Sequence, residues 1–137
     1  MNIPTSQLPR IVIVGAGFAG LSLARKLMAK HLFQVVLIDK NNYHQFQPLF
    51  YQVAMAGLEP SSISFPLRRV LRSDANVYIR IAEVLSVDPS LNMIITDIGS
   101  LVYDYLILAT GAKTNFFGNH NIEKIALTLK SLSEALL

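Results

Sequence analysis

The sequence predicts an α/β fold, in which a parallel sheet is packed against helices and carries an inserted antiparallel β-meander. Two runs, Ile11–Val14 and Gln34–Asp39, have apolar interiors, as is typical of central parallel strands. Between them lie a glycine-rich turn and a segment with helical periodicity. From residue 76 onward, apolar side chains alternate with others, which is typical of antiparallel strands. Together these observations favour a strand–helix–strand unit followed by a meander.

The turn after the first strand has the spacing Gly15-x-Gly17-x-x-Gly20. Gly15 permits a tight turn from strand to helix, and Gly20 lets the helix pack close to the strand. Gly17 lets a pyrophosphate approach the backbone, since it has no Cβ, and the positive end of the helix dipole favours the negative charge. Apolar positions then recur at helical spacing, at Leu21, Leu23, Ala24, Leu27 and Met28. This pattern predicts a Rossmann-like dinucleotide-binding turn.

An acidic residue ends the second strand at the place that this fold requires. Asp39 follows Gly20 by 19 positions, where a carboxylate can accept hydrogen bonds from the ribose hydroxyls of an adenine nucleotide. The apolar stretch could also be interpreted as the core of a signal peptide. Glycines interrupt it and no cleavage-site pattern follows, so this alternative is disfavoured.

The composition restricts the classes of function. The 137 residues suffice for about one domain, yet 52% are hydrophobic and only 15% are charged. This excess predicts strands buried on both faces, or surfaces that meet something outside this chain. The net charge of +3 is spread out except at Arg68, Arg69 and Arg72, so nucleic-acid binding is not expected. There is no cysteine, and the three histidines lack ligand spacing, so a metal site has no support.

The remaining elements follow from turn residues and periodicity. Residues 1–9 form a polar lead with two prolines, which we expect to be frayed. Asn41-Asn42 predicts a turn. A short helix is expected between Pro48 and Gly57, and a second around Ser64–Leu71.

A meander and a final strand are expected in the second half. The alternating run Val77–Ala82 begins it, and the later strands are predicted at Glu83–Asp88, Met93–Asp97 and Leu101–Tyr103. The segment Asp104–Gly111 predicts a buried apolar strand that ends in glycine. Residues 112–121 are expected to form a loop, and a helix is expected within Lys130–Leu137.

These features resemble the flavoproteins with two dinucleotide-binding domains, the pyridine nucleotide-disulfide oxidoreductase superfamily. The resemblance rests on the glycine fingerprint, Asp39, the meander and Leu-Ala-Thr110-Gly111-Ala. Within the superfamily, Asn42-Tyr-His44-x-Phe46-x-Pro48-Leu-Phe-Tyr51-Gln-Val-Ala54 is similar to a segment of type II, non-proton-pumping NADH dehydrogenases. Disulfide reductases of the superfamily carry a redox cysteine pair after the second strand. This chain has no cysteine, which argues against a thiol relay.

The resemblance implies FAD as cofactor and assigns residues to its parts. Asp39 would hold the adenosine ribose with Lys40 beside it, and the backbone of Ala82 and Val84 would face the adenine. Gln47 and Pro48 would approach the isoalloxazine. The other implied contacts are to the pyrophosphate (Gly15, Ala16, Gly17, Phe18, Ala19, Gly20) and beside the flavin (Ala109, Thr110, Gly111). No side chain is expected to act as a catalytic acid, base or nucleophile.

The implied function is that of an NADH:quinone oxidoreductase of the respiratory chain. Hydride would pass from NADH to FAD, and electrons would then pass to a quinone. The family's second glycine fingerprint, its later FAD-domain segment and its C-terminal membrane-docking region have no counterpart in this sequence. Residues 10–137 are therefore expected to be the N-terminal part of an FAD-binding domain, incomplete at the C-terminus. We expect this piece to self-associate and not to turn over NADH alone. The full-length protein is expected to be cytoplasmic and peripheral on the inner face of the membrane.

Three alternatives remain open. The first is another FAD enzyme of the same fold, such as a sulfide:quinone oxidoreductase or a ferredoxin/nitrite-type reductase. The second is a plain NAD-binding Rossmann module, in which Asp39 would hold an NAD ribose; the meander followed by Ala-Thr-Gly argues against it. The third is a structural fragment that binds no ligand.

Overall fold

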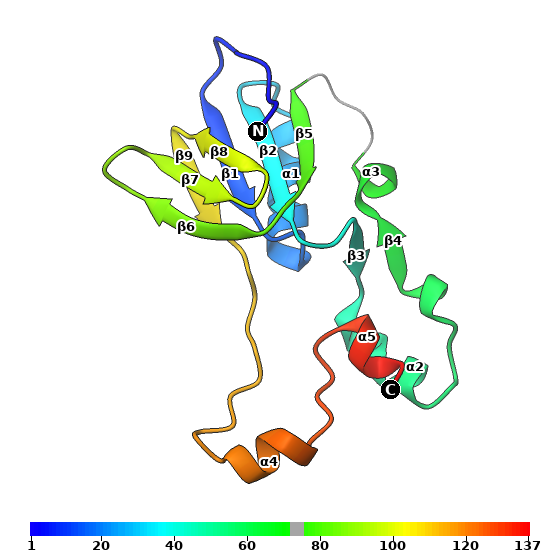
Figure 1. Cartoon of the computed structure of the whole chain (residues 1–137). Helices are drawn as coiled ribbons and strands as arrows, with labels where there is room; N and C mark the ends of the chain where they lie inside the picture. The colour runs from blue at the N-terminus through cyan, green and yellow to red at the C-terminus, as the bar shows by residue number, and fades with distance from the viewer. Residues whose placement is uncertain (72–75) are drawn as a thin grey trace. The chain divides into compact units, whose positions relative to one another are not determined.

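A computed structural model of the chain describes residues 1–71 and 76–137 (Figure 1). Arg72, the third member of the basic cluster, lies outside the described residues. The chain divides into two compact units, each described below by itself. The first comprises residues 1–43 and 66–110, and the second comprises residues 44–65 and 111–137.

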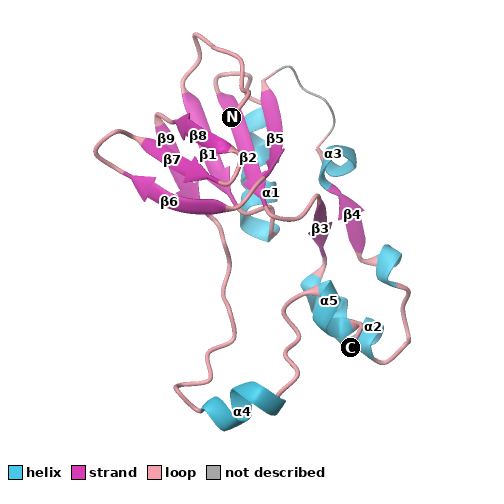
Figure 2. Cartoon of the chain, viewed as in Figure 1, coloured by secondary structure: helices cyan, strands magenta, loops and turns pink. Residues whose placement is uncertain are grey.

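A parallel sheet of four strands is the centre of the first unit (Figure 2). Its order is β5-β2-β1-β9, from strands β1 (Arg10–Val14), β2 (Gln34–Asp39), β5 (Val77–Ile81) and β9 (Tyr105–Leu108). Val12 pairs with Val36 on one side and with Leu106 on the other, and Leu37 pairs with Ile79. The predicted α/β fold with a parallel sheet is confirmed.

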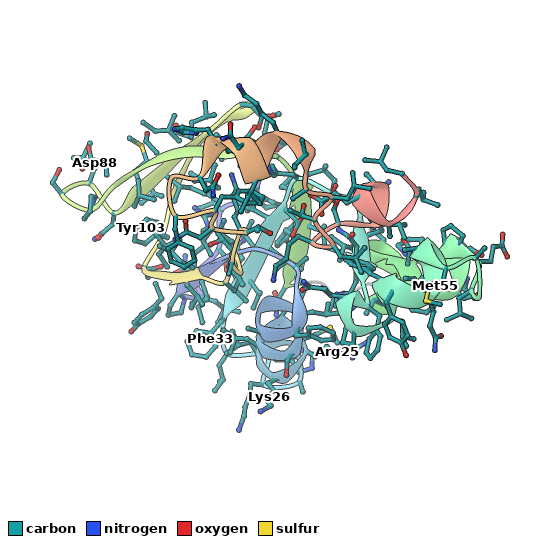
Figure 3. All side chains as sticks on the ribbon, turned by 90° about the horizontal axis from the view of Figure 1, so that it is seen from below. Arg25, Lys26, Phe33, Met55, Asp88 and Tyr103 are labelled. Atoms are coloured by element: carbon teal, nitrogen blue, oxygen red, sulfur yellow. The ribbon has the colours of Figure 1, made fainter. Side chains whose placement is uncertain are left out.

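The two central strands are buried on both faces, which explains their uninterrupted apolar runs. Successive side chains of a strand point to opposite faces. Ile11 and Ile13 therefore join the cluster beneath helix α1 (Phe18–Met28), together with Leu21, Ala24 and Leu37. Arg25 and Lys26 project from the outer side of α1 (Figure 3).

The opposite face of the sheet is covered by the antiparallel meander. Strands β6 (Val84–Asp88), β7 (Met93–Thr96) and β8 (Gly99–Val102) pair in the order β6-β7-β8. Ile94 and Leu101 of this meander pack against Val12 and Val36 of the parallel sheet. The predicted inserted meander is therefore present, lying on the side of the sheet away from α1 (Figure 2).

Two strand expectations were wrong in detail. Val77–Ala82 does not open the meander, because β5 pairs in parallel with β2; its alternation reflects a half-buried strand at the edge of the sheet. The last strand was expected to be buried, yet Tyr105 and Leu108 are 58% and 64% exposed. Among the described strands, β9 pairs with β1 alone, so one of its edges has no strand beside it.

The N-terminal lead was expected to be frayed, and this was also wrong. Met1 and Ile3 pack against the cluster that the meander covers. The carbonyl of Pro4 accepts a hydrogen bond of 2.9 Å from Nε2 of Gln34, a polar side chain that is buried at the start of β2. The lead therefore packs against the core, because it meets buried polar and apolar groups at that end of the sheet.

The second unit has a small core of its own. Phe50 and Val53 of helix α2 (Phe50–Ala54) pack with Ala135 of helix α5 (Leu132–Ala135). Ile63, which lies in the chain between the two helices, completes this cluster. The other elements of this region are β3 (Tyr43–Gln45), which pairs with β4 (Ser64–Pro66), the 3-10 helices η1 (Gln47–Leu49) and η2 (Pro60–Ser62), and α4 (His120–Ile125).

Local sequence signals predicted these short elements unevenly. The helix expected over Ser64–Leu71 begins only at Leu67, as α3 (Leu67–Val70), because Ser64–Pro66 pairs with β3 instead. The residue with positive φ after α2 is Ala56, at 56°, and not Gly57. Helix α4 was not expected at all; Asn119 caps it by accepting from the Ile122 N–H.

The expected helix near the C-terminus is confirmed as α5. Ser131 and Glu134 form a capping box, in which each side chain accepts from the other residue's backbone N–H.

Candidate functional site

The glycine turn lies between the carboxyl ends of three strands. The Gly15 N–H donates to the carbonyl of Ile38, the penultimate residue of β2, at 2.8 Å. Gly15 has a φ of +103°, and a Cβ built on it would stand 2.3 Å from the carbonyl oxygen of Ala109, beyond the end of β9. A side chain at position 15 is therefore excluded both by backbone conformation and by contact with β9.

Neither backbone conformation nor packing within the described structure requires glycine at position 17. It has a negative φ of −70° at the N-cap of α1, and a Cβ built on it would have no neighbour within 4 Å. Gly15 and Gly20, in contrast, have protein atoms pressed against that position. The open space beside Gly17 is where a group from outside the protein could reach the backbone.

The N-terminus of α1 suits an anion. The helix has 11 residues, no side chain caps its first turn, and that turn contains no acidic residue. Gly17, Phe18 and Ala19 are exposed there. The helix dipole places partial positive charge at such an end, so a phosphate would be stabilised.

Asp39 connects this turn to the neighbouring strand. One oxygen of its carboxylate accepts from the Ala16 N–H at 2.6 Å, and the other accepts from the Asn41 N–H at 2.8 Å. Its backbone carbonyl accepts from the Ala82 N–H at 2.9 Å. A carboxylate has about four acceptor sites. Asp39 is thus fixed in place and retains capacity for hydroxyl donors.

Beyond Asp39, the chain between β5 and β6 forms the next part of the edge. Ala82 is buried and Val84 is half-buried. Lys40 Nζ lies 3.7 Å from the carboxylate of Glu83, and both side chains are more than half exposed. Such an exposed ion pair contributes little to stability.

The end of β9 closes the other side of the turn. The Ala109 N–H donates to the carbonyl of Val14 at 2.8 Å, so the strand follows β1 to its last residue. Thr110 comes next and is exposed. Gly111 has a φ of +73° and begins the second stretch of the other unit.

The predicted residues of the first unit therefore lie along one edge of the sheet in a linear order. From β5 to β9 this order is Ala82, Asp39, the glycine turn and Ala109, since the strands run β5-β2-β1-β9. The chain passes from β1 to β2 on one side and reaches β9 on the other, so the turn occupies a topological switch point. Open α/β sheets bind ligands at such a point, outside the carboxyl ends of the strands.

A family model described as pyridine nucleotide-disulphide oxidoreductase matches residues 9–135. The chain belongs to this family. Over 97% of its length it is 36% identical to Ndh, a type II NADH:quinone oxidoreductase of Mycobacterium tuberculosis, and it spans 30% of that protein. The family resemblance inferred from the motifs is confirmed.

Solved structures of relatives agree with the fold of this chain. NDH2 of Plasmodium falciparum, solved in complex with NADH, superposes with a TM-score of 0.82 at 28% identity, over 95% of this chain and 28% of that one. The sulfide:quinone oxidoreductase of Aquifex aeolicus superposes with a TM-score of 0.79 at 29% identity, over 93% of this chain and 30% of that one.

Gln47 and Pro48 lie in η1 of the second unit and are exposed. Their approach to a flavin stays a prediction, as does that of Gly111. His44, in the same motif, is buried. The motif thus contributes both to the interior of the second unit and to its surface.

Sequence reasoning missed one contact at the site. Asp97, in the turn between β7 and β8, accepts from the Glu83 N–H at 2.9 Å and donates its own N–H to the Glu83 carbonyl at 3.1 Å. Turn chemistry before Gly99 was visible in the sequence, but no local pattern relates residue 97 to residue 83. This pairing depends on how β6 and β7 fold back on each other.

Within residues 1–71 and 76–137, no helix has the length and apolar character needed to cross a bilayer. The same residues contain no group of three or more potential metal ligands of the kinds His, Asp and Glu.

Proposed function

We propose that this chain binds FAD as the N-terminal part of the FAD-binding domain of an NADH:quinone oxidoreductase. The observation that carries the proposal is the open backbone at Gly17, which adjoins a fixed carboxylate at Asp39 on one edge of the sheet. The similarity to Ndh across 97% of the chain supports the choice of enzyme.

The order of groups along the sheet edge fits the adenosine diphosphate half of FAD. In that half, pyrophosphate, ribose and adenine are joined in sequence. Pyrophosphate at Gly17 and the N-terminus of α1 would place the ribose at Asp39, which lies beside the turn through its bond to Ala16. The adenine, attached to the ribose, would then meet the segment from Ala82 to Val84 on the far side of β2.

The protein's part is to bind, orient and exclude water. Gly15, Ala16, Phe18, Ala19 and Gly20 would complete the cradle of the pyrophosphate, and Lys40 would stand beside the ribose. Ala109 and Thr110 would pass the flavin. Gln47, Pro48 and Gly111 stay predicted flavin contacts, as the family resemblance implies. When bound, FAD supplies hydride acceptance and stepwise electron release. No side chain of this chain is assigned a proton transfer.

The whole protein's activity is proposed to be electron transfer from NADH to a quinone. The chain spans 30% of the Mycobacterium tuberculosis relative, so the NADH-binding domain is proposed to lie in sequence beyond these 137 residues. The fragment alone is therefore expected to be inactive with NADH. A place in the respiratory chain, peripheral attachment to the inner face of the membrane and self-association of this piece belong to the same proposal.

A sulfide:quinone oxidoreductase is the second candidate, because the Aquifex aeolicus structure superposes almost as well as NDH2. The two differ in electron donor. A plain NAD-binding module is the third candidate, and it would use the same turn and Asp39 for a different dinucleotide.

The deciding experiment is the visible spectrum of the purified chain, with any released cofactor identified after denaturation. Apo protein is then titrated with FAD and with NAD. We expect flavin absorbance, or uptake of FAD in preference to NAD. Uptake of NAD without FAD would favour the plain module, and binding of neither would refute FAD binding by this chain.

A further inference from the structure

Asp97 holds the backbone of Glu83 with two reciprocal hydrogen bonds. Its Oδ1 accepts from the Glu83 N–H at 2.9 Å, while its own N–H donates to the Glu83 carbonyl at 3.1 Å. Asp97 and Glu83 are both exposed, so burial does not impose the geometry of this pair. The bonds tie the start of β6 to the turn that follows β7.

The strand ladder is interrupted beside this segment. Val84 pairs with Thr96, but the register shifts between Val84 and Ser86, where β6 carries a bulge. A bulge leaves a residue unpaired and bends the strand. The regular pairing that begins at Ser86 therefore does not continue unbroken to Val84, and the Asp97 bonds add a constraint at its predecessor, Glu83.

The turn that carries Asp97 is itself held firmly. The Thr96 side chain is buried; its hydroxyl donates to the Gly99 carbonyl and accepts from the Ile98 N–H. On the other side of the segment, the Ala82 N–H donates to the carbonyl of Asp39. Residues 82–84 are thus held between the backbone of Asp39, whose carboxylate is the proposed ribose acceptor, and the turn that carries Asp97.

We infer that Asp97 is a positioning residue for recognition of the adenine base, acting through the backbone of residues 82–84. The inference rests on the proposed FAD site. Adenine offers an amino donor at N6 and an acceptor at N1. Backbone C=O and N–H groups in fixed positions can pair with this arrangement and not with a base whose donor and acceptor are exchanged. A backbone free to shift loses this discrimination, whereas the pyrophosphate contacts at α1 are unaffected.

The test compares ADP with inosine diphosphate, in which the donor and acceptor of the base edge are reversed. The wild-type chain is expected to bind ADP about tenfold tighter, the difference that one or two hydrogen bonds make. In Asp97→Ala, this ratio should fall to about two or less while inosine diphosphate binds as before. Asp97→Asn retains an acceptor oxygen for the Glu83 N–H and should restore most of the preference.

Asp88 provides a matched control in the same meander. It caps the turn after β6, where its carboxylate accepts from the Ser90 N–H and hydroxyl and from the Leu91 N–H. It stands at the tip of the β6–β7 hairpin, the end away from Val84 (Figure 3). Asp88→Ala removes three side-chain hydrogen bonds, against one in Asp97→Ala, and should nevertheless leave the ratio unchanged. Loss of the preference in Asp88→Ala, or its persistence in Asp97→Ala, would overturn the inference.

Amide hydrogen exchange of the ligand-free chain separates this inference from the proposed function. Asp97→Ala should accelerate exchange at Glu83 by at least about tenfold, and Asp88→Ala should not. Unchanged exchange at Glu83 would refute the positioning role whatever the nucleotide results. If the wild-type chain binds neither FAD nor ADP, the proposed function is refuted, and so is the role of Asp97 in adenine recognition. This holds even if exchange at Glu83 accelerates in Asp97→Ala as expected.

Discussion

The carbonyl oxygen of Gly15 lies 1.9 Å from the position that a Cβ on Gly20 would occupy. A side chain at position 20 would therefore collide with the backbone of the preceding turn, and α1 could not keep its distance from β1. Gly17, three residues earlier, has no such neighbour within 4 Å. Two glycines of one motif are thus required for different physical reasons, one for a ligand and one for packing. Substitution of each glycine distinguishes these reasons.

Gly17→Ala is expected to fold with a stability change of about 1 kcal/mol or less, since only the N-cap preference is affected. Its affinity for FAD should fall at least about tenfold, because the new methyl occupies the space for the phosphate. Gly20→Ala should instead destabilise the chain by several kcal/mol, on the order of an overpacked core. Thermal unfolding and flavin titration check both variants. Equal FAD affinity in Gly17→Ala and the wild type would refute the assigned phosphate contact.

Asp39→Ala removes two carboxylate bonds to backbone N–H groups and should lower stability by about 1–3 kcal/mol. FAD affinity should fall as well, because the ribose loses its acceptor. Asp104→Ala is the matched control: its carboxylate accepts from the Arg10 N–H at 2.6 Å, at the opposite end of the sheet. Chemical denaturation should show a loss of stability in both variants, and isothermal titration should show weakened FAD binding only for Asp39→Ala.

The packed N-terminal lead predicts a stability effect where the sequence predicted none. Ile3→Ser removes a partly buried apolar side chain from the cluster under the meander and should cost about 1–2 kcal/mol. Leu91→Ser, at an exposed turn of the same meander, should change stability by less than about 0.5 kcal/mol. Urea denaturation measures both. If Ile3→Ser unfolds like the wild type, the lead does not pack in solution.

The open edge of β9 predicts self-association. Tyr105–Leu108 has no charge or proline to discourage pairing with another strand, and Leu108 is 64% exposed. Leu108→Lys should shift the chain toward monomer in light scattering at high concentration. Leu91→Lys, equally exposed but away from the edge, should not. A monomeric wild type would contradict this prediction.

Helix α5 predicts an acid-sensitive local structure. The backbone N–H of Lys130, together with the Thr128 hydroxyl and the Ser131 N–H, holds the pKa of Glu134 below its ordinary value of 4.5. A lowered pKa in the folded state means that this stabilisation is present above the ordinary value and is lost as pH falls through the lowered pKa. The protection of α5 amides against hydrogen exchange, relative to their intrinsic rates at each pH, should therefore fall below about pH 4.5. Glu134→Gln should abolish that pH dependence, and its persistence in the variant would assign it to another group.

Much of the fold could be predicted from local sequence. Apolar runs indicated β1 and β2, helical periodicity indicated α1, and the spacing of Leu132 and Leu136 indicated a helix within Lys130–Leu137, because each of these signals acts within a few residues. The glycine turn and Asp39 were recognisable because dinucleotide binding demands residue types at set spacings. The family followed from the same spacings together with the motif around His44.

Other features were decided only by tertiary structure, since their partners are distant in sequence. The alternation of Val77–Ile81 is compatible with either an antiparallel or a parallel edge strand, and only pairing with β2 chose the parallel one. The lead at Met1–Pro9 is polar overall, yet the buried Gln34 and the cluster under the meander give it contacts that no local pattern shows. The Asp97–Glu83 bonds arise in the same way, because strand pairing and a bulge bring together two residues whose sequence environments have nothing in common.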